Sequence, residues 1–347
     1  YYITNTIIKY LLIIMTPMQE TIINKETTST PIWLMRQAGR YLPEFREIRK
    51  NNPDFINLCL NEKLSSEITL QPLKRFDLDA GIIFSDILML PYGLGQEVEF
   101  KKNFGPQLGL LNLEIISKVD DISFLKKLRP VYDSIKRVSG NNLLKNKNLI
   151  GFVGAPWTLL VYMINRHSPK KQLIKDFFKD ENLIKKILII LEKFMKLHVE
   201  HQVKNGASII QIFDSWAGLL NEKDLTNYIY NPTLNLVDYT KSLNVPVICF
   251  PRGIRNYKNY CDIIKPDVIN IDYEVDPTTI CKKINIPVQG GMDPKVLLTD
   301  TENLKKEALK YLEIFKDHPY VFNLGHGVLP ETNPNMVDYL VKTVKDY

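Results

Sequence analysis

Eight short apolar runs, rich in β-branched residues, recur along the chain and alternate with stretches that have the periodicity of amphipathic helices. They cover residues 32–35, 80–84, 149–153, 208–213, 245–250, 268–271, 286–289 and 320–324. The runs are too apolar for a sheet with one face in water, and repeated strand–helix alternation is typical of a closed parallel barrel. The sequence therefore predicts an α/β fold, a (β/α)8 TIM barrel in a single domain.

The clearest helical stretch runs from Glu181 to Lys204 and ends before Gly206, a natural C-terminal residue for a helix. Further helices are expected at 222–242, 257–264, 278–284 and 302–315, and a hairpin over the barrel mouth is expected from 93–102 with Gly105 and Pro106. A doubly wound open sheet is the rival fold. It would place a glycine-rich phosphate loop after an early strand, and neither a GxGxxG nor a P-loop pattern stands there.

Composition supports one large domain. The chain has 347 residues, 45% of them hydrophobic, and no low-complexity linker divides it. We assign the barrel to residues 31–347 and read little from residues 1–30. The apolar run 10–15 is too short to span a bilayer, so no membrane association is expected. Residues 1–14 are interpreted either as upstream translated sequence or as the product of a fragmentary gene model.

Charge and cysteine usage limit the partners and the compartment. The net charge of +6 is modest and no basic block with interleaved aromatic residues occurs, so nucleic acid is not an expected partner. The four cysteines are far apart and form no CxxC pair. This pattern indicates a reducing compartment and a cytoplasmic location.

Arginines gather just after the first run. In a parallel barrel the chemistry lies at the carboxyl ends of the strands, and Arg36 and Arg40 flank a glycine turn at such an end. Arg46 and Arg49 follow on a predicted helix. Guanidinium groups bind carboxylates through paired hydrogen bonds, so we interpret Arg36 and Arg40 as ligand-binding and Arg46 as part of an exposed helix with ion pairs to nearby glutamates.

Other strand ends carry polar residues with two interpretations each. Asp86 is either a functional carboxylate or a helix N-cap, and spacing alone leaves both open. Tyr162 follows the third run on a helix, where core packing is the common role. His326 lies between two glycines, which favours a close approach to a ligand. His198 and His201 are three apart, and an exposed helix face explains them better than half a zinc site.

Six segments, taken together, resemble the uroporphyrinogen decarboxylase family and occur in the family's order from about Pro31 to the end of the chain. They are 31–43 (PIWLMRQAGRYLP), 84–88 (FSDIL), 151–159 (GFVGAPWTL), 272–273 with 276–277, 289–294 (QGGMDP) and 322–330 (FNLGHGVLP). The resemblance implies a lyase of porphyrin and heme biosynthesis that converts the four acetate side chains of uroporphyrinogen III to methyls, giving coproporphyrinogen III. It implies no cofactor, because a protonated pyrrole takes up the electrons left by carbon dioxide.

The resemblance also implies roles for individual residues. Asp86 would accept the pyrrole N–H groups at the centre of the tetrapyrrole and stabilise the cation formed on protonation. Arg36 would lie nearest the reacting acetate and act as proton donor, which for a group with a pKa above about 12 favours relay from water. The expected catalytic residues are Asp86, Arg36, Tyr162 and His326, and the expected substrate-binding residues are Arg36, Arg40, Arg49, Asp86, Tyr162, Ser215 and His326.

The chain departs from the family pattern at 164–169, where an acidic residue and glycines are common in the family. The same-fold alternative is a zinc-dependent corrinoid methyltransferase, but the His-x-Cys pair of those enzymes is missing after His198 and His326, so no metal is expected. An inactive tetrapyrrole carrier is disfavoured because Asp86, Arg36 and His326 are intact. The resemblance further implies a homodimer.

Overall fold

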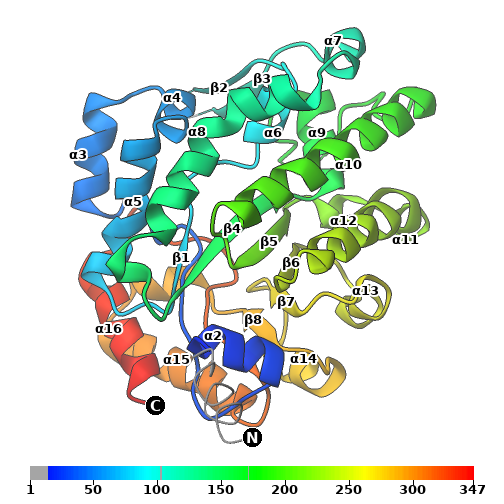
Figure 1. Ribbon diagram of the computed structural model, residues 1–347. Helices are drawn as coiled ribbons and strands as arrows, with labels where there is room; N and C mark the ends of the chain where they lie inside the picture. The colour runs from blue at the N-terminus through cyan, green and yellow to red at the C-terminus, as the bar shows by residue number, and fades with distance from the viewer. Residues whose placement is uncertain (1–14, 102–103, 171) are drawn as a thin grey trace, which may run out of the picture.

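The computed structural model describes residues 15–101, 104–170 and 172–347, and a curled parallel sheet of seven strands forms its centre (Figure 1). The strands, in their order in the sheet, are β1 (Ala80–Ile82), β4 (Asn148–Gly154), β5 (Ile209–Asp214), β6 (Val247–Pro251), β7 (Val268–Ile271), β8 (Val288–Gly290) and β9 (Tyr320–Val321). Each pairs in parallel with its neighbour, which confirms seven of the runs as strands.

Helices cover the outer face of this sheet (Figure 1). The α-helices of the described residues are α2 (Pro17–Gln19), α3 (Pro43–Asn51), α4 (Phe55–Cys59), α5 (Glu62–Arg75), α6 (Met89–Gly93), α7 (Leu113–Ser117), α8 (Asp121–Ser139), α9 (Pro156–Asn165), α10 (Glu181–Lys204), α11 (Glu222–Leu225), α12 (Asn231–Ser242), α13 (Tyr257–Ile264), α14 (Pro277–Lys283), α15 (Thr301–Phe315) and α16 (Pro334–Lys345). The predicted helices over 181–204 and 257–264 are confirmed to the residue. The one expected over 222–242 is interrupted by a π-helical segment, Thr226–Tyr230.

The first apolar run, 32–35, does not form the predicted strand. Ile32 makes only an isolated parallel bridge with Phe322, the Ile32 carbonyl accepts the N–H of Asp79 at 2.9 Å, and Arg36 then adopts a left-handed backbone with φ 59°. The run is therefore hydrogen-bonded on one side to the chain after β9 and on the other to the chain before β1. The turn at Arg36 ends it before a regular ladder can form.

The predicted hairpin is confirmed: β2 (Val98–Lys101) and β3 (Gly105–Leu108) pair antiparallel. The loop after α9 joins it, because the Arg166 carbonyl accepts the N–H of Leu108 at 2.7 Å and Gln107 forms an antiparallel bridge with His167. The segment 164–169, where the chain departs from the family pattern, is thereby fixed against the hairpin.

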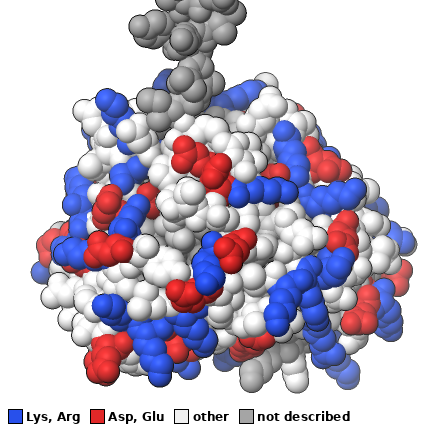
Figure 2. Space-filling model, turned by 90° about the horizontal axis from the view of Figure 1, so that it is seen from below, with Lys and Arg blue, Asp and Glu red and all other residues white. Residues whose placement is uncertain are grey.

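The amino-terminal ends of the strands are closed by residues 16–24, where sequence analysis had assigned no structure. Thr16 and Gln19 form a capping box for α2, which continues into the π-helical segment Glu20–Asn24. Met18 and Ile22 pack against apolar strand residues such as Ile150. Figure 2 shows the face seen from below, where α2 lies in Figure 1, and on it basic and acidic side chains are interspersed. No helix in the described ranges is long and apolar enough to cross a membrane.

Candidate active site

Four of the predicted site residues meet at the carboxyl ends of the strands. Arg36, Asp86, Tyr162 and His326 come from segments far apart in sequence, yet Arg36 is close enough to influence the pKa of each of the other three. All four keep some accessible surface while burial is the largest cause of each pKa shift. Partial exposure combined with strong desolvation is the signature of a concave, crowded site.

Arg36 is held in place through its backbone. The N–H of Met35 donates to Asn323 Oδ1 at 3.0 Å and the Met35 carbonyl accepts the N–H of Val328 at 2.9 Å. The Arg36 side chain packs directly on Gly327, where a Cβ would come within 2.4 Å of Arg36 Cδ. Burial lowers the pKa of the Arg36 guanidinium, and Asp86 opposes this while Arg40 and Arg252 add to it.

Asp86 is a poorly neutralised carboxylate. Burial raises its pKa to about 6, against the opposing effects of the Leu88 N–H and of Arg36. Its Oδ1 accepts the Leu88 N–H at 2.8 Å, but the N-cap residue of α6 is Leu88 itself. The N-cap interpretation of Asp86 is thus wrong, and the carboxylate is left to accept hydrogen bonds from the mouth.

Tyr162 remains a hydrogen-bond donor. Burial and the nearby Asp86 raise its pKa to about 12, while Arg36 opposes the shift. Its ring meets that of Trp216 edge to face, with 5.9 Å between centroids.

His326 is neutral near pH 7. Burial, followed by the charges of Arg36 and Arg252, lowers its pKa to about 4. The two flanking glycines have separate steric causes: a Cβ at Gly325 would lie 2.2 Å from the Tyr273 nitrogen, and one at Gly327 would collide with Arg36. The close approach at Gly325 is therefore made to the backbone of Tyr273, and the one at Gly327 to the side chain of Arg36.

The guanidinium groups of the predicted arginines differ in exposure and in the hydrogen bonds they make within the protein. Arg40 is exposed and close enough to lower the pKa of Arg36. Arg49 is half-buried on α3, where its Nη1 donates to the carbonyls of Asn52 at 2.7 Å and Pro53 at 3.1 Å. One edge of the Arg49 guanidinium is thus occupied by hydrogen bonds within the protein. Arg49 is therefore a weaker candidate than Arg40 for binding a carboxylate of a ligand.

Arg46 is engaged within the protein, but not by the expected glutamates. Its Nη1 donates to the carbonyls of Arg40 and Tyr41, each at 2.9 Å. Glu44 instead pairs with Arg75 at 2.9 Å. Arg46 therefore fixes the backbone of the arginine turn, and the expectation of an ion pair was wrong.

Ser215 lies in a turn fastened to α9. Thr158 Oγ1 donates to Asp214 Oδ1 at 2.7 Å and accepts the Trp216 N–H at 3.2 Å, so it brackets Ser215 on both sides. Tyr162 follows Thr158 by one helical turn, on the same face of α9. This arrangement sets Ser215 and Tyr162 in a fixed relation. Burial raises the pKa of Asp214 to about 7.

Arg252 belongs to the cluster, although sequence reasoning gave it no role. It follows β6 directly, and its charge lowers the pKa of both Arg36 and His326. The available signal was its position at the end of an apolar run, after Pro251. That signal is shared by many residues, and only the curl of the sheet brings Arg252 to Arg36.

Two other features lie outside this cluster. His198 is buried and hydrogen-bonded through Nδ1 to the Tyr132 hydroxyl at 3.0 Å, and burial lowers its pKa to about 3, so the exposed helix face expected there was wrong. In residues 15–101, 104–170 and 172–347, no group of three or more His, Cys, Asp and Glu residues could hold a metal ion.

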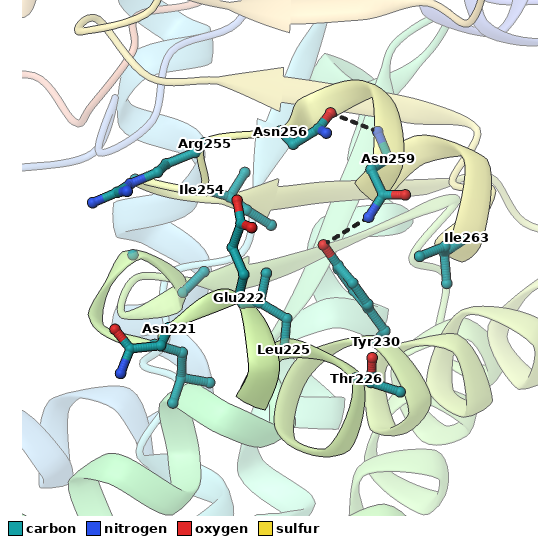
Figure 3. Close-up of a pocket in the computed structure, with 14 residues that line it drawn as sticks. Asn221, Glu222, Leu225, Thr226, Tyr230, Ile254, Arg255, Asn256, Asn259 and Ile263 are labelled. Carbon is teal, nitrogen blue, oxygen red and sulfur yellow. Dashed lines mark hydrogen bonds between the residues drawn. The ribbon is translucent and has the colours of Figure 1, made fainter.

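A cavity of about 360 Å³ lies between the loops after β5 and β6 (Figure 3). Glu222, Arg255 and Asn259 are among the residues that line it, and none of the predicted site residues does.

Comparisons with known proteins match the chain over almost all of its length. A model of the uroporphyrinogen decarboxylase (URO-D) family matches residues 15–347. The protein belongs to the uroporphyrinogen decarboxylase family. The uroporphyrinogen decarboxylase of Rickettsia bellii is 39% identical over 332 residues, 91% of this chain and 95% of that one. That of Campylobacter jejuni is 40% identical over 330 residues, 93% and 96% of the two chains.

The family predicted from the six motifs is thus confirmed, and with it the enzyme class, a carboxy-lyase. Among solved structures, a methyltransferase from Methanosarcina mazei superposes with a TM-score of 0.76, covering 96% of this chain and 99% of its own, at 16% sequence identity. That likeness shows a shared α/β fold. At such low identity it says nothing about a shared reaction.

Proposed function

We propose that this protein removes the four acetate carboxyls of uroporphyrinogen III, without a cofactor, to give coproporphyrinogen III. The observation that supports this most is Asp86, a buried carboxylate beside Arg36 at the carboxyl ends of the strands, with Arg40 and Arg252 close to Arg36 in turn. A polyanionic tetrapyrrole with four inward N–H groups complements both features. The arginines match its peripheral carboxylates, and Asp86 matches its centre.

The reaction needs only proton transfers. Protonating the ring carbon between the pyrrole nitrogen and the acetate-bearing carbon gives a cationic iminium conjugated to the acetate. The bond to the carboxylate then breaks, carbon dioxide leaves, and the electron pair forms an exocyclic double bond that neutralises the nitrogen. A proton adds to the exocyclic carbon and the ring proton leaves. Each acetate consumes one proton and releases one carbon dioxide.

The residues would divide these tasks by charge. Ionised Asp86 would accept the pyrrole N–H groups and stabilise the iminium, a preorganised electrostatic effect. Arg36 would hold the reacting acetate and relay the proton, and its lowered pKa favours that role. Arg40 and Arg49 would bind acetates and propionates. Tyr162, Ser215 and neutral His326 would hydrogen-bond peripheral carboxylates.

The proposal extends to architecture and assembly. We take segment 31–33, which hydrogen-bonds toward both β9 and β1, as the place where the sheet closes into a single-domain (β/α)8 barrel over residues 31–347. We also propose a homodimer located in the cytoplasm, as expected from the family resemblance and from the dispersed cysteines. Sedimentation of the purified protein at the mass of a monomer would contradict the dimer.

The decisive experiment is anaerobic incubation with uroporphyrinogen III, with carbon dioxide and the porphyrin products followed by mass and chromatography. We expect products with seven, six, five and four carboxyls to appear in turn. Activity should persist after dialysis against a chelator. Retention of all eight carboxyls by an enzyme that binds the substrate would reject the proposal, and stoichiometric zinc with methyl transfer would favour the methyltransferase alternative.

A further inference from the structure

Arg252 occupies the middle of the sheet. In the strand order, β6 lies three strands from β1 and three from β9, whereas Asp86 follows β1 and His326 follows β9. Its guanidinium still lowers the pKa of His326 and of Arg36. The curled sheet therefore brings the end of β6 close to Arg36 and to His326.

The backbone of Arg252 is held on several sides. Its N–H donates to the Asp214 carbonyl at 3.0 Å and its carbonyl accepts the Gly218 N–H at 3.0 Å. The next residue, Gly253, has φ 77° and donates its N–H to the buried carboxylate of Asp272 at 2.9 Å. A Cβ on Gly218 would come within 2.8 Å of the Gly253 carbonyl oxygen, so these two loops touch backbone to backbone.

The side chain of Arg252, by contrast, makes no hydrogen bond or ion pair with any residue in the described ranges. The same holds for Arg36 and Arg40, whereas Arg46, Arg49 and others donate to carbonyls or carboxylates. A rigid backbone that presents an unused, half-buried guanidinium beside other cations is unfavourable until an anion arrives. Such a group is suited to bind one.

We propose that Arg252 is a further substrate-binding residue, which pairs with a peripheral carboxylate of the tetrapyrrole on the wall of the mouth opposite Arg40. This inference rests on the proposed function. A tetrapyrrole centred on Asp86 directs its carboxylates outward in every direction, and the previously predicted arginines all come from residues 36–49 on one side. Arg252 supplies the cation on the other side and favours the more highly carboxylated forms.

The test compares Arg252→Met with Arg252→Lys and with Arg255→Met. Arg255 is an exposed arginine in the same loop that lines the separate cavity of Figure 3, and it is a matched control. KM and kcat are measured for uroporphyrinogen, with eight carboxyls, and for the five-carboxyl intermediate, at low and high salt. Binding of oxidised uroporphyrin, followed by fluorescence, gives a readout independent of turnover.

For Arg252→Met we expect KM for uroporphyrinogen to rise about 10-fold or more, with kcat changed less than about threefold and a weaker salt dependence. The rise should be smaller for the five-carboxyl intermediate. Arg252→Lys should recover most of the loss, and Arg255→Met should stay within about twofold of the parent. An unchanged KM and uroporphyrin affinity in Arg252→Met would overturn the proposal. If Arg252→Met fails to fold, the Arg252→Gln variant carries the same comparison.

The experiment separates this inference from the proposed function. If the unmodified enzyme releases no carbon dioxide, the proposed function fails. If it is active and Arg252→Met matches it in KM, only the role of Arg252 fails. A fall in kcat without a change in KM would also contradict a binding role.

Discussion

Two carboxylates at opposite ends of β1 are held in contrasting surroundings. Asp79, just before the strand, accepts the N–H of Ile32 at 2.7 Å and the ammonium of Lys345 at 2.6 Å. Asp86, beyond the other end, accepts a single N–H from Leu88, and burial raises its pKa to about 6. One carboxylate is neutralised within the protein and the other is left with capacity for a partner from outside.

The same contrast extends to the two ends of the sheet. At the amino-terminal end, Met18 and Ile22 close the interior with apolar contacts. At the carboxyl end, the charge of Arg252 acts against that of Arg36, and Asp86 is the carboxylate that offsets the charge of Arg36. In enzymes built on a parallel α/β sheet, the carboxyl ends of the strands carry the chemistry and the opposite ends contribute to stability. Substitutions at the two ends should therefore separate stability from activity.

The largest effect is expected for Asp86→Asn. Losing a preorganised charge at the reacting centre should lower kcat by about 10²–10³-fold. The melting temperature should not fall, because the variant removes a desolvated carboxylate with few partners. Steady-state kinetics together with thermal unfolding checks both parts, and near-normal turnover would refute the central role of Asp86.

Asp79→Asn should show the opposite behaviour. Breaking its ion pair leaves Lys345 without a partner, which we expect to cost about 2 kcal/mol of unfolding free energy. The cost lies below that of a fully buried pair because the Lys345 side chain is 29% exposed. The kcat should be unchanged once it is corrected for the fraction of folded protein, which a urea unfolding curve gives. A loss of kcat without a loss of stability would erase the distinction between the two ends.

How far the sequence predicts this site depends on how local each interaction is. The strand over 268–271 and the arginine turn follow from short-range pattern and motif. The first run was misjudged because its apolar residues resemble a strand, whereas the left-handed turn at Arg36 ends it before a regular ladder can form. Arg252 was missed because its importance arises only when the curl of the sheet brings the end of β6 close to His326, which follows β9.

Gly327→Ala tests how precisely Arg36 must be placed. The new Cβ would come within 2.4 Å of Arg36 Cδ, a flexible side chain that can move aside, so the fold should survive while kcat falls about tenfold. Gly325→Ala would instead meet backbone at 2.2 Å and should lower the melting temperature. Gly140→Ala, with no contact closer than 3.6 Å, is the neutral control. Equal kinetics in Gly327→Ala and Gly140→Ala would show that Arg36 tolerates displacement.

The dependence on pH separates the two roles of charge at Asp86. Because its pKa in the folded protein is raised to about 6 from 3.8, the folded state binds more protons than the unfolded state between these values. Stability should therefore decrease as pH rises from about 4 to 6, by up to about 3 kcal/mol. Activity should run the other way, since the ionised form is needed: kcat/KM should fall about twofold at pH 6 and tenfold for each unit below.

Two variants test which residue causes the loss of activity at acidic pH, the acidic limb of the pH profile. His326 has its pKa lowered to about 4, so His326→Asn should lower activity yet keep the limb near pH 6. Asp214, with a pKa raised to about 7, is the competing origin, and Asp214→Asn should also retain the limb if Asp86 causes it. Disappearance of the limb in Asp214→Asn would transfer the titration to the turn that holds Ser215. In that case Asp86 would remain ionised over the whole pH range in which activity falls.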